Sequence, residues 1–291
     1  MIESRTCIVC GSSDNFAPMF DILARCRACG FVTWSGTASD DLSKLYDERY
    51  FTAVDYPDYV GNELSLRRSM KRHLDQMARY VSARGAVLEI GCAYGFFLDE
   101  AQKRFDRVVG IDVAQSAVAH ARKHLKVNAL SGAFLDARFE DGSFDVICFW
   151  DTIEHLDRPD LFLQKSRRLL QPDGRLFLTT GDISSLSARM RGSKWRQIHP
   201  PSHVHYFSRD SITRLLGRVG FRVLGIETAA YYHTLHNILA SIDLRGGATG
   251  RLSHLALAAV GEPLSRRIGL WINLGDIMFV AAAPMAPANA T

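Results

Sequence analysis

The sequence lacks a long hydrophobic run and a strong excess of charge of either sign. It contains no stretch of about 18 uncharged apolar residues, so no membrane-spanning helix is expected. The opening residues, MIESRTCIVC, contain no apolar segment typical of a secretory leader, and we expect a cytoplasmic protein. Lysine and arginine number 35 against 31 acidic residues, a balance that makes nucleic acid an unlikely partner.

Proline and glycine are also too few for a collagen-like or low-complexity chain. There are 9 prolines and 22 glycines in 291 residues, and 47% of the residues are hydrophobic, which argues against general disorder. A chain of this length buries a core without needing disulfides. At about 150 residues per domain, the length predicts roughly two domains.

Four of the six cysteines form two close pairs near the N-terminus. The pattern is C-x2-C, fifteen intervening residues and C-x2-C, and a glycine follows each pair. This spacing allows four thiolates to surround one zinc ion tetrahedrally, with no open position, so we expect a structural zinc in a ribbon over residues 1–36. Two redox CxxC motifs are the weaker alternative. The expected ligands are Cys7, Cys10, Cys26 and Cys29.

From residue 86 onward, strand-like and helix-like patterns alternate, which predicts an α/β fold with a mostly parallel sheet and crossover helices. The expected strands are 86–91, 107–113, 126–132, 144–150, 175–180 and 221–227, with a late strand at 276–283. The expected helices are 96–105, 116–125, 159–170 with Asp157 as its cap, and one that begins at Ser208.

The remaining segments flank or interrupt this α/β region. Residues 37–84 are expected to form a helical cap or linker, and the main domain should cover 85–286. Within it, residues of about 230–271 predict a mostly helical insertion that serves as a substrate lid or a homodimer contact. The Pro/Ala-rich tail, 287–291, should be loose.

A glycine-containing turn follows the first strand of the alternating region. The segment LEIGCAYG ends at Gly95, and its glycines allow the backbone to approach a ligand closely. The motif is not GxGxxG, so a dinucleotide is disfavoured. Asp112 closes the next strand, where its carboxylate can accept hydrogen bonds from two ribose hydroxyls, although a helix cap is an alternative role.

Several motifs, taken in their order along the chain, resemble those of one family. VLEIGCAYG, GID, DGSFDVICFWDTIEHLDRP and RLLQPDGRLFLTT are similar to class I S-adenosylmethionine-dependent methyltransferases, in particular ubiquinone-pathway O-methyltransferases and sugar methyltransferases. The upstream segment Leu45–Phe51 resembles the Y-x3-YF cap that precedes many such domains. The resemblance implies a Rossmann-like, mostly parallel seven-stranded sheet with an antiparallel last strand, and S-adenosylmethionine as cofactor. It further implies a cofactor site of Glu89, Gly91, Cys92 and Gly95 at the methionine end, Asp112 at the ribose, Ala133 and Phe134 at the adenine, and Asp151 at the edge of the methionine site.

Two histidines and a glutamate are candidates for acceptor chemistry. Glu154 and His155 follow the fourth strand and His203 follows the fifth, and ligands in such sheets bind beyond the carboxyl ends of the strands. A histidine titrates near neutrality and suits general-base work, whereas a structural role is the alternative. HVHYFS resembles the EH-x-x-YFS segment of zinc-containing nucleotide-sugar C-methyltransferases, which implies that His203 is the active-site histidine.

The surrounding loop suggests how the acceptor is held. Trp195, Tyr206 and Phe207 could stack on a ring-shaped acceptor, and Glu154 could fix the tautomer of His155. The leading hypothesis is therefore methylation of a small-molecule acceptor, a sugar or nucleotide sugar, on oxygen or carbon. The alternatives are a ribosomal RNA methyltransferase that grips RNA through its zinc ribbon, and a non-catalytic zinc-ribbon adaptor.

Overall fold

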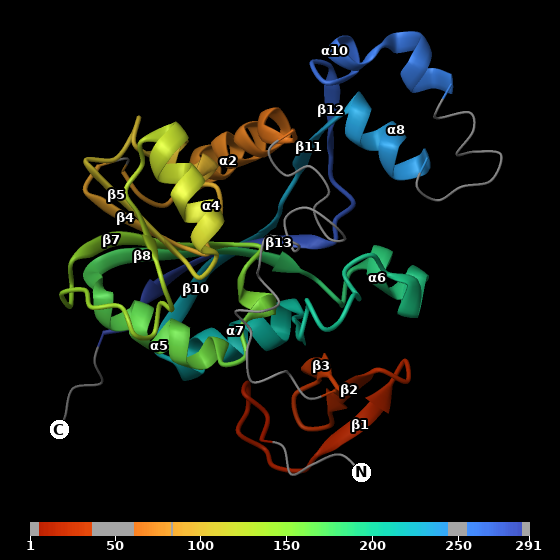
Figure 1. Ribbon diagram of the computed structural model, residues 1–291. Coiled ribbons are helices and arrows are strands. Elements are labelled where there is room, and N and C mark those ends of the chain that lie inside the picture. The colour runs from red at the N-terminus through yellow and green to blue at the C-terminus, as the bar shows by residue number, and fades with distance from the viewer. Residues whose placement is uncertain (1–5, 37–60, 83, 244–254, 287–291) are drawn as a thin grey trace.

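A small N-terminal ribbon packs beneath a larger α/β domain (Figure 1). The structure is a computed structural model that describes residues 6–36, 61–82, 84–243 and 255–286. The expected cap motif at Leu45–Phe51 and the tail at 287–291 lie outside these residues. None of the described helices is long and apolar enough to cross a membrane.

A seven-stranded sheet forms the centre of the larger domain, in the order β10-β13-β8-β7-β4-β5-β6. Strands β4 to β8 pair in parallel, whereas β13 runs antiparallel between β8 and β10. This confirms the predicted Rossmann-like sheet with its antiparallel last strand. The strands are β4 (Ala86–Ile90), β5 (Arg107–Asp112), β6 (Ala129–Ser131), β7 (Phe144–Trp150), β8 (Leu170–Gly181), β10 (Phe221–Thr228) and β13 (Ile277–Pro284).

Helices cover both faces of this sheet because successive side chains of each buried strand point to opposite sides. In β4, Val87 packs into the cluster that contains helices α2, α3 and α4, and Leu88 packs into the cluster that contains α5 and α7. Figure 1 shows α2 and α4 above the sheet and α5 and α7 below it. The helices are α2 (Glu63–Met77), α3 (Phe96–Ala101), α4 (Gln115–His120, continued by the π-helical turn η1 at Ala121–Leu125), α5 (Pro159–Leu169) and α7 (Arg209–Arg218).

Two helix starts test the predicted caps. Ser208 forms a capping box with Ser211 at the start of α7, as the sequence predicts. The prediction that Asp157 caps α5 is wrong, because Arg158 occupies the N-cap and forms no capping side-chain hydrogen bond among the described atoms. Pro159 lies in the first turn of α5, where a main-chain N–H would have no partner within the helix, so its missing N–H costs nothing.

The segment before the last strand rises above the edge of the sheet (Figure 1). It begins with β11 (Tyr231–Thr234) and α8 (Leu235–Asp243) and ends with α10 (Glu262–Ser265) and β12 (Gly269–Ile272). Strands β11 and β12 pair antiparallel, so this part of the chain has a strand pair at its base as well as helices. The main-chain N–H of Tyr232 donates to Ser69 Oγ at 3.0 Å and ties β11 to α2.

The ribbon shares a sheet with the larger domain. Its strands β1 (Phe16–Met19), β2 (Leu23–Cys26) and β3 (Val32–Trp34) are joined by β9 (His205–Tyr206), a strand from the loop that follows β8. Between β8 and β9 lie α6 (Leu186–Arg191) and the 3-10 turn η3 (Gly192–Lys194). Phe31 of the ribbon is buried in the same core as α5 and α7. The ribbon is therefore docked on the domain and not tethered loosely to it.

Candidate functional site

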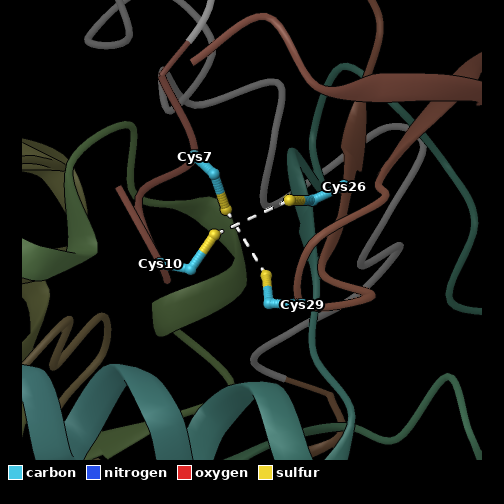
Figure 2. Close-up of side chains that lie close together, drawn as sticks. All are labelled: Cys7, Cys10, Cys26 and Cys29. Carbon is cyan, nitrogen blue, oxygen red and sulfur yellow. Dashed lines mark hydrogen bonds between the residues drawn. The ribbon is translucent and has the colours of Figure 1, made fainter. Parts of the chain in front are cut away.

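Four cysteine sulfurs in the ribbon converge on one point (Figure 2). The Sγ atoms of Cys7 and Cys29 lie 3.6 Å apart, and those of Cys10 and Cys26 lie 3.7 Å apart. Sulfurs held tetrahedrally about 2.3 Å from zinc stand roughly 3.8 Å from one another, whereas a disulfide bond is about 2.05 Å long. The four residues therefore have the geometry of a closed zinc site and not of two disulfides.

The two cysteine pairs have the same backbone geometry. The N–H of Gly11 donates to the carbonyl of Cys7, and the N–H of Gly30 donates to that of Cys26, both at 2.8 Å. The two glycines have φ angles of 76° and 75°, in the left-handed region that glycine adopts without strain. The repeated CxxCG of the sequence thus folds into two matching knuckles.

The turn after β4 is the expected cofactor loop, and it packs closely against the turn after β7. Gly91 has a φ of 80°, and a Cβ built on it would lie 2.5 Å from Thr152 Oγ1. Gly95 has a φ of 78°, and its Cβ would lie 2.9 Å from Ala121 Cβ. Both positions therefore require glycine for the backbone angle and for the close approach.

Asp112 links this turn to the loop after β5. Its Oδ2 accepts a hydrogen bond from the Ala93 N–H and its Oδ1 accepts one from the Ala114 N–H, both at 2.8 Å. Each carboxylate oxygen can accept a second hydrogen bond, so the side chain is oriented and still able to bind hydroxyls. Asp112 thus holds two loop N–H groups, whereas Ala114 is the N-cap of the following helix α4, and the ribose-binding role of Asp112 stays a prediction.

Glu89 and Cys92 lie buried beside this loop. No described atom forms a hydrogen bond with Oε2 of Glu89, and burial together with the Asp112 charge raises the pKa of the Glu89 carboxyl. A buried acceptor without a partner is costly, so a bound cationic group would stabilise this site. Burial also raises the pKa of the Cys92 thiol well above its usual range, which makes Cys92 a packing residue rather than a nucleophile.

The predicted adenine segment follows β6. Ala133 is exposed, whereas the Phe134 ring is buried and lies 5.5 Å from the Phe162 ring. Lys165 Nζ donates to the Phe134 carbonyl at 2.6 Å and fixes its main chain. Phe134 can therefore present its backbone to a ligand more readily than its ring.

Asp151 lies at the carboxyl end of β7 under a tyrosine that the sequence did not identify. The Tyr231 hydroxyl donates to Asp151 Oδ2 at 2.7 Å, and the Thr179 hydroxyl donates to Oδ1 at 2.9 Å. His73 of α2 stacks on Trp150 with ring centroids 4.8 Å apart and meets the edge of Tyr231 at 5.5 Å. Three segments distant in sequence thus enclose one side of this site.

The three candidate acceptor residues come together in space. One ligand atom from each of Glu154, His155 and His203 lies within 4.8 Å of the others, and all three side chains are buried. Glu154 and His155 belong to the 3-10 turn η2 (Ile153–His155), which directly follows Thr152 beside the cofactor loop. The structure therefore places the predicted histidines next to each other and close to the predicted cofactor site.

Main-chain carbonyls orient both rings. Nδ1 of His155 lies 2.8 Å from the Ser202 carbonyl oxygen, and Nδ1 of His203 lies 2.9 Å from the Gln197 carbonyl oxygen. A carbonyl only accepts, so Nδ1 of His203 donates and its Nε2 carries the lone pair. The expectation that Glu154 fixes the tautomer of His155 is wrong, because Ser202 supplies that contact.

Burial keeps this cluster uncharged near neutral pH. It lowers the pKa of His155 to about 4 and lowers that of His203 well below its usual range. Burial and the Asp151 charge raise the pKa of Glu154. Neutral imidazoles can accept a proton, as a general base must, but the lowered pKa makes each ring a weaker base than a free histidine.

The expected aromatic contacts to an acceptor are wrong. Trp195, Tyr206 and Phe207 are at most 3% exposed, and the Trp195 indole N–H donates to Asp276 at 2.9 Å. The Phe207 ring lies 5.5 Å from Phe31 of the ribbon. Because the ribbon covers this loop, its aromatic side chains build the interface between the two parts.

Comparison with known proteins agrees with this geometry. A family model described as a methyltransferase domain matches residues 63–226, more than half of the chain. A protein of Mycolicibacterium smegmatis, named a probable S-adenosylmethionine-dependent methyltransferase, is 30% identical over 56% of this chain and 60% of its own length. A ubiquinone biosynthesis O-methyltransferase of Actinobacillus pleuropneumoniae is 33% identical over 32% of this chain and 44% of its own. The chain thus spans less than two thirds of either relative.

A solved structure of a SAM-dependent methyltransferase from Thermotoga maritima has the same fold. It superposes with a TM-score of 0.51 at 19% identity and covers 78% of this chain and 95% of its own. Together with the family match, the fold and the ordered motifs of the cofactor loop lead to one conclusion: the chain belongs to the S-adenosylmethionine-dependent methyltransferases.

Proposed function

We propose that this methyltransferase acts on a sugar, a nucleotide sugar or a similar small metabolite, and transfers the methyl group to an oxygen or a carbon atom. The observation that carries the proposal is the buried pair of His155 and His203 beside the cofactor loop. Ser202 stands where the similar C-methyltransferases carry glutamate, so oxygen is the acceptor atom that we favour.

We place the cofactor at the carboxyl ends of β4 and β5, where the residues fit it. S-adenosylmethionine, when bound, supplies an activated methyl group on a cationic sulfur. The unpartnered Oε2 of Glu89 suits the cationic methionine end, and Asp112 can accept from ribose hydroxyls. The remaining contacts would come from Gly91, Cys92, Gly95, Ala133, Phe134 and Asp151.

We assign proton removal from the acceptor to His203, with His155 as the second candidate. The Gln197 carbonyl holds Nδ1–H of His203, so the lone pair on Nε2 can take the proton. Glu154, held protonated by burial, can donate a hydrogen bond within the same cluster. The chain also aligns the acceptor with the methyl group, and such alignment supplies a large share of the rate enhancement in group-transfer reactions.

We further propose that the four cysteines hold a structural zinc and that residues of about 230–271 form an insertion that contacts a second copy. In this insertion Leu270 and Trp271 of β12 are 52% and 42% exposed, unlike the buried strands of the main sheet. Light scattering of the wild type and of Leu270→Glu tests this contact, since the charged variant should be monomeric if a dimer forms there.

The acceptor class is tested by measuring the demethylated cofactor released with nucleotide sugars, free glycans and ribosomal RNA as separate substrates. We expect turnover with a nucleotide sugar or glycan. Turnover with RNA alone would contradict the proposal and support the alternative in which the ribbon grips nucleic acid. Binding of the demethylated cofactor without turnover on any substrate would leave the cofactor site correct and the acceptor class wrong.

A further inference from the structure

The ribbon reaches the acceptor side of the domain through a strand pair. Strand β3 pairs antiparallel with β9, and the register places Thr33 opposite His205 and Val32 opposite Tyr206. Strand β9 begins two residues after His203. One edge strand of the ribbon sheet, β9, therefore belongs to the same short loop that carries the proposed base.

Val204 is hydrogen-bonded both to the ribbon and to the turn η2. Its carbonyl oxygen accepts from the Thr33 hydroxyl at 2.9 Å and from the Trp34 N–H at 2.8 Å, and its own N–H donates to the Glu154 carbonyl at 3.0 Å. The peptide units on both sides of Val204 are thus held, one by the ribbon and one by the turn η2. His203 is joined to Val204 by one of these peptide units.

Side chains continue the same bridge. Nδ1 of His205 lies 3.1 Å from Thr33 Oγ1, and its Nε2 lies 3.2 Å from the Asp157 carbonyl oxygen. The His205 ring also packs on Phe31, with ring centroids 5.4 Å apart. Thr33 is 6% exposed, and its hydroxyl contacts both Val204 and His205, so water cannot readily replace the hydroxyl.

The cysteine site is hydrogen-bonded to the residue that precedes β3. The Cys26 N–H donates to the Phe31 carbonyl at 2.7 Å, and Phe31 follows Cys29 by two residues. Cys7 and Cys26 are buried in the same core as Phe31 and Phe207. A bound metal would therefore fix the segment that presents Thr33 to the loop.

We propose that the ribbon sets the position of the acceptor-side histidine loop, and that Thr33 is a positioning residue for His203. The catalytic consequence rests on the proposed function, whereas the mechanical coupling does not. The ribbon would then be required for turnover through the loop that it holds, and not through direct contact with the reacting atoms. Its removal should affect the loop 199–206 and leave the cofactor loop 89–95 unchanged.

The test compares Thr33→Val, which keeps the shape of the side chain and removes the hydroxyl, with Thr33→Ser, which keeps the hydroxyl. Thr213→Val on the exposed surface of α7 is the matched control. Hydrogen exchange of the Val204 N–H is measured in the presence of the demethylated cofactor, and calorimetry gives the affinity for that cofactor. Turnover is measured with the acceptor that the substrate panel identifies.

For Thr33→Val we expect Val204 exchange to rise and turnover to fall, each on the order of tenfold, with cofactor affinity unchanged. Thr33→Ser should restore both, and Thr213→Val should match the wild type. Wild-type exchange at Val204 in Thr33→Val, or a serine variant as impaired as the valine variant, would overturn the proposal. Because exchange needs no acceptor, failure of the proposed function does not affect this result.

A second measurement covers the case in which Thr33→Val does not fold. The wild-type protein is treated with a metal chelator, and exchange is followed in the loops 199–206 and 89–95. Faster exchange confined to 199–206 supports the coupling. The coupling is contradicted if the chelator changes the exchange rate of neither loop. It is also contradicted if the rate rises by the same factor in both loops.

Discussion

The hydroxyl of Tyr231 donates a hydrogen bond of 2.7 Å to Asp151 Oδ2, and so joins the first strand of the insertion to the carboxyl end of β7. The two residues are 80 positions apart in the chain. His73 of α2 packs against the same tyrosine ring. The insertion is therefore anchored at the proposed cofactor site and is not simply an appendage to the last strand.

Removing this anchor should loosen the insertion. Tyr231→Phe leaves a partly buried carboxylate oxygen without its donor, and we expect the free energy of unfolding to fall by about 1–3 kcal/mol. Hydrogen exchange across residues 231–234 should rise. Tyr232→Phe is the control, because neighbouring side chains on a strand face opposite sides. Equal exchange in the two variants would show that the Asp151 contact does not hold the insertion.

Asp112→Ala should weaken binding of S-adenosylmethionine and of its demethylated product. The carboxylate orients two loop N–H groups and is placed to accept from the ribose, and loss of such charge-assisted bonds costs about 1.5–3 kcal/mol, which is tenfold or more in affinity. Calorimetry checks this, with the exposed Asp136→Ala as control. Equal affinity for the wild type and Asp112→Ala would remove the ribose assignment.

Loss of the base should lower turnover without affecting cofactor affinity. A general base contributes about 10²- to 10⁴-fold, so His203→Ala should reduce kcat by that order, and His155→Ala should do so if it shares the proton. His124→Ala, an exposed histidine, serves as control. If both variants keep full turnover with the true acceptor, alignment alone carries the reaction.

Metal analysis should find one zinc per chain in protein purified without chelator. Cys26→Ser should lose it, because three thiolates and a hydroxyl form a poorer site, while Cys148→Ala should retain it. Cofactor affinity should stay unchanged in both. Absence of zinc from the wild type would refute the ribbon site. A second equivalent that survives Cys26→Ser would mean that Glu154, His155 and His203 also bind metal.

Stability should fall between neutral and acid pH, in part because of His73. Burial lowers the pKa of its imidazole from 6.5 to about 4. The nearby Asp151 charge acts to raise this pKa, and the Arg72 charge acts to lower it. The unfolded chain then binds the proton first, so the contribution is complete above pH 6.5 and is lost as the pH falls towards 4. At pH 5 the loss should be about 2 kcal/mol.

Urea unfolding at pH 7.5 and pH 5 measures this loss. His73→Phe keeps a ring against Trp150 and should show a smaller drop than the wild type, although His155 and His203 still contribute. The exposed His124→Gln should behave as the wild type does. Equal drops in the wild type and His73→Phe would show that His73 does not titrate in this way.

Local sequence patterns were enough to predict the sheet and the two cysteine knuckles. Continuous apolar runs predict buried strands, and the CxxCG repeat predicts its own turn because every contact in it lies within five residues. The order of the motifs also placed Asp112 and Glu89 at the carboxyl ends of adjacent strands. These features depend on period and spacing, which a sequence displays directly.

Only the tertiary structure decided which surfaces meet. The sequence predicts that Tyr206 and Phe207 stack on an acceptor, but the ribbon covers them, and nothing near them in the chain indicates a partner about 170 residues away. The contacts of Thr33 with Val204 and of Tyr231 with Asp151 are hidden for the same reason. A hydrogen bond between distant segments leaves no periodicity in either one, so it appears only when the packing of the whole chain brings the two together.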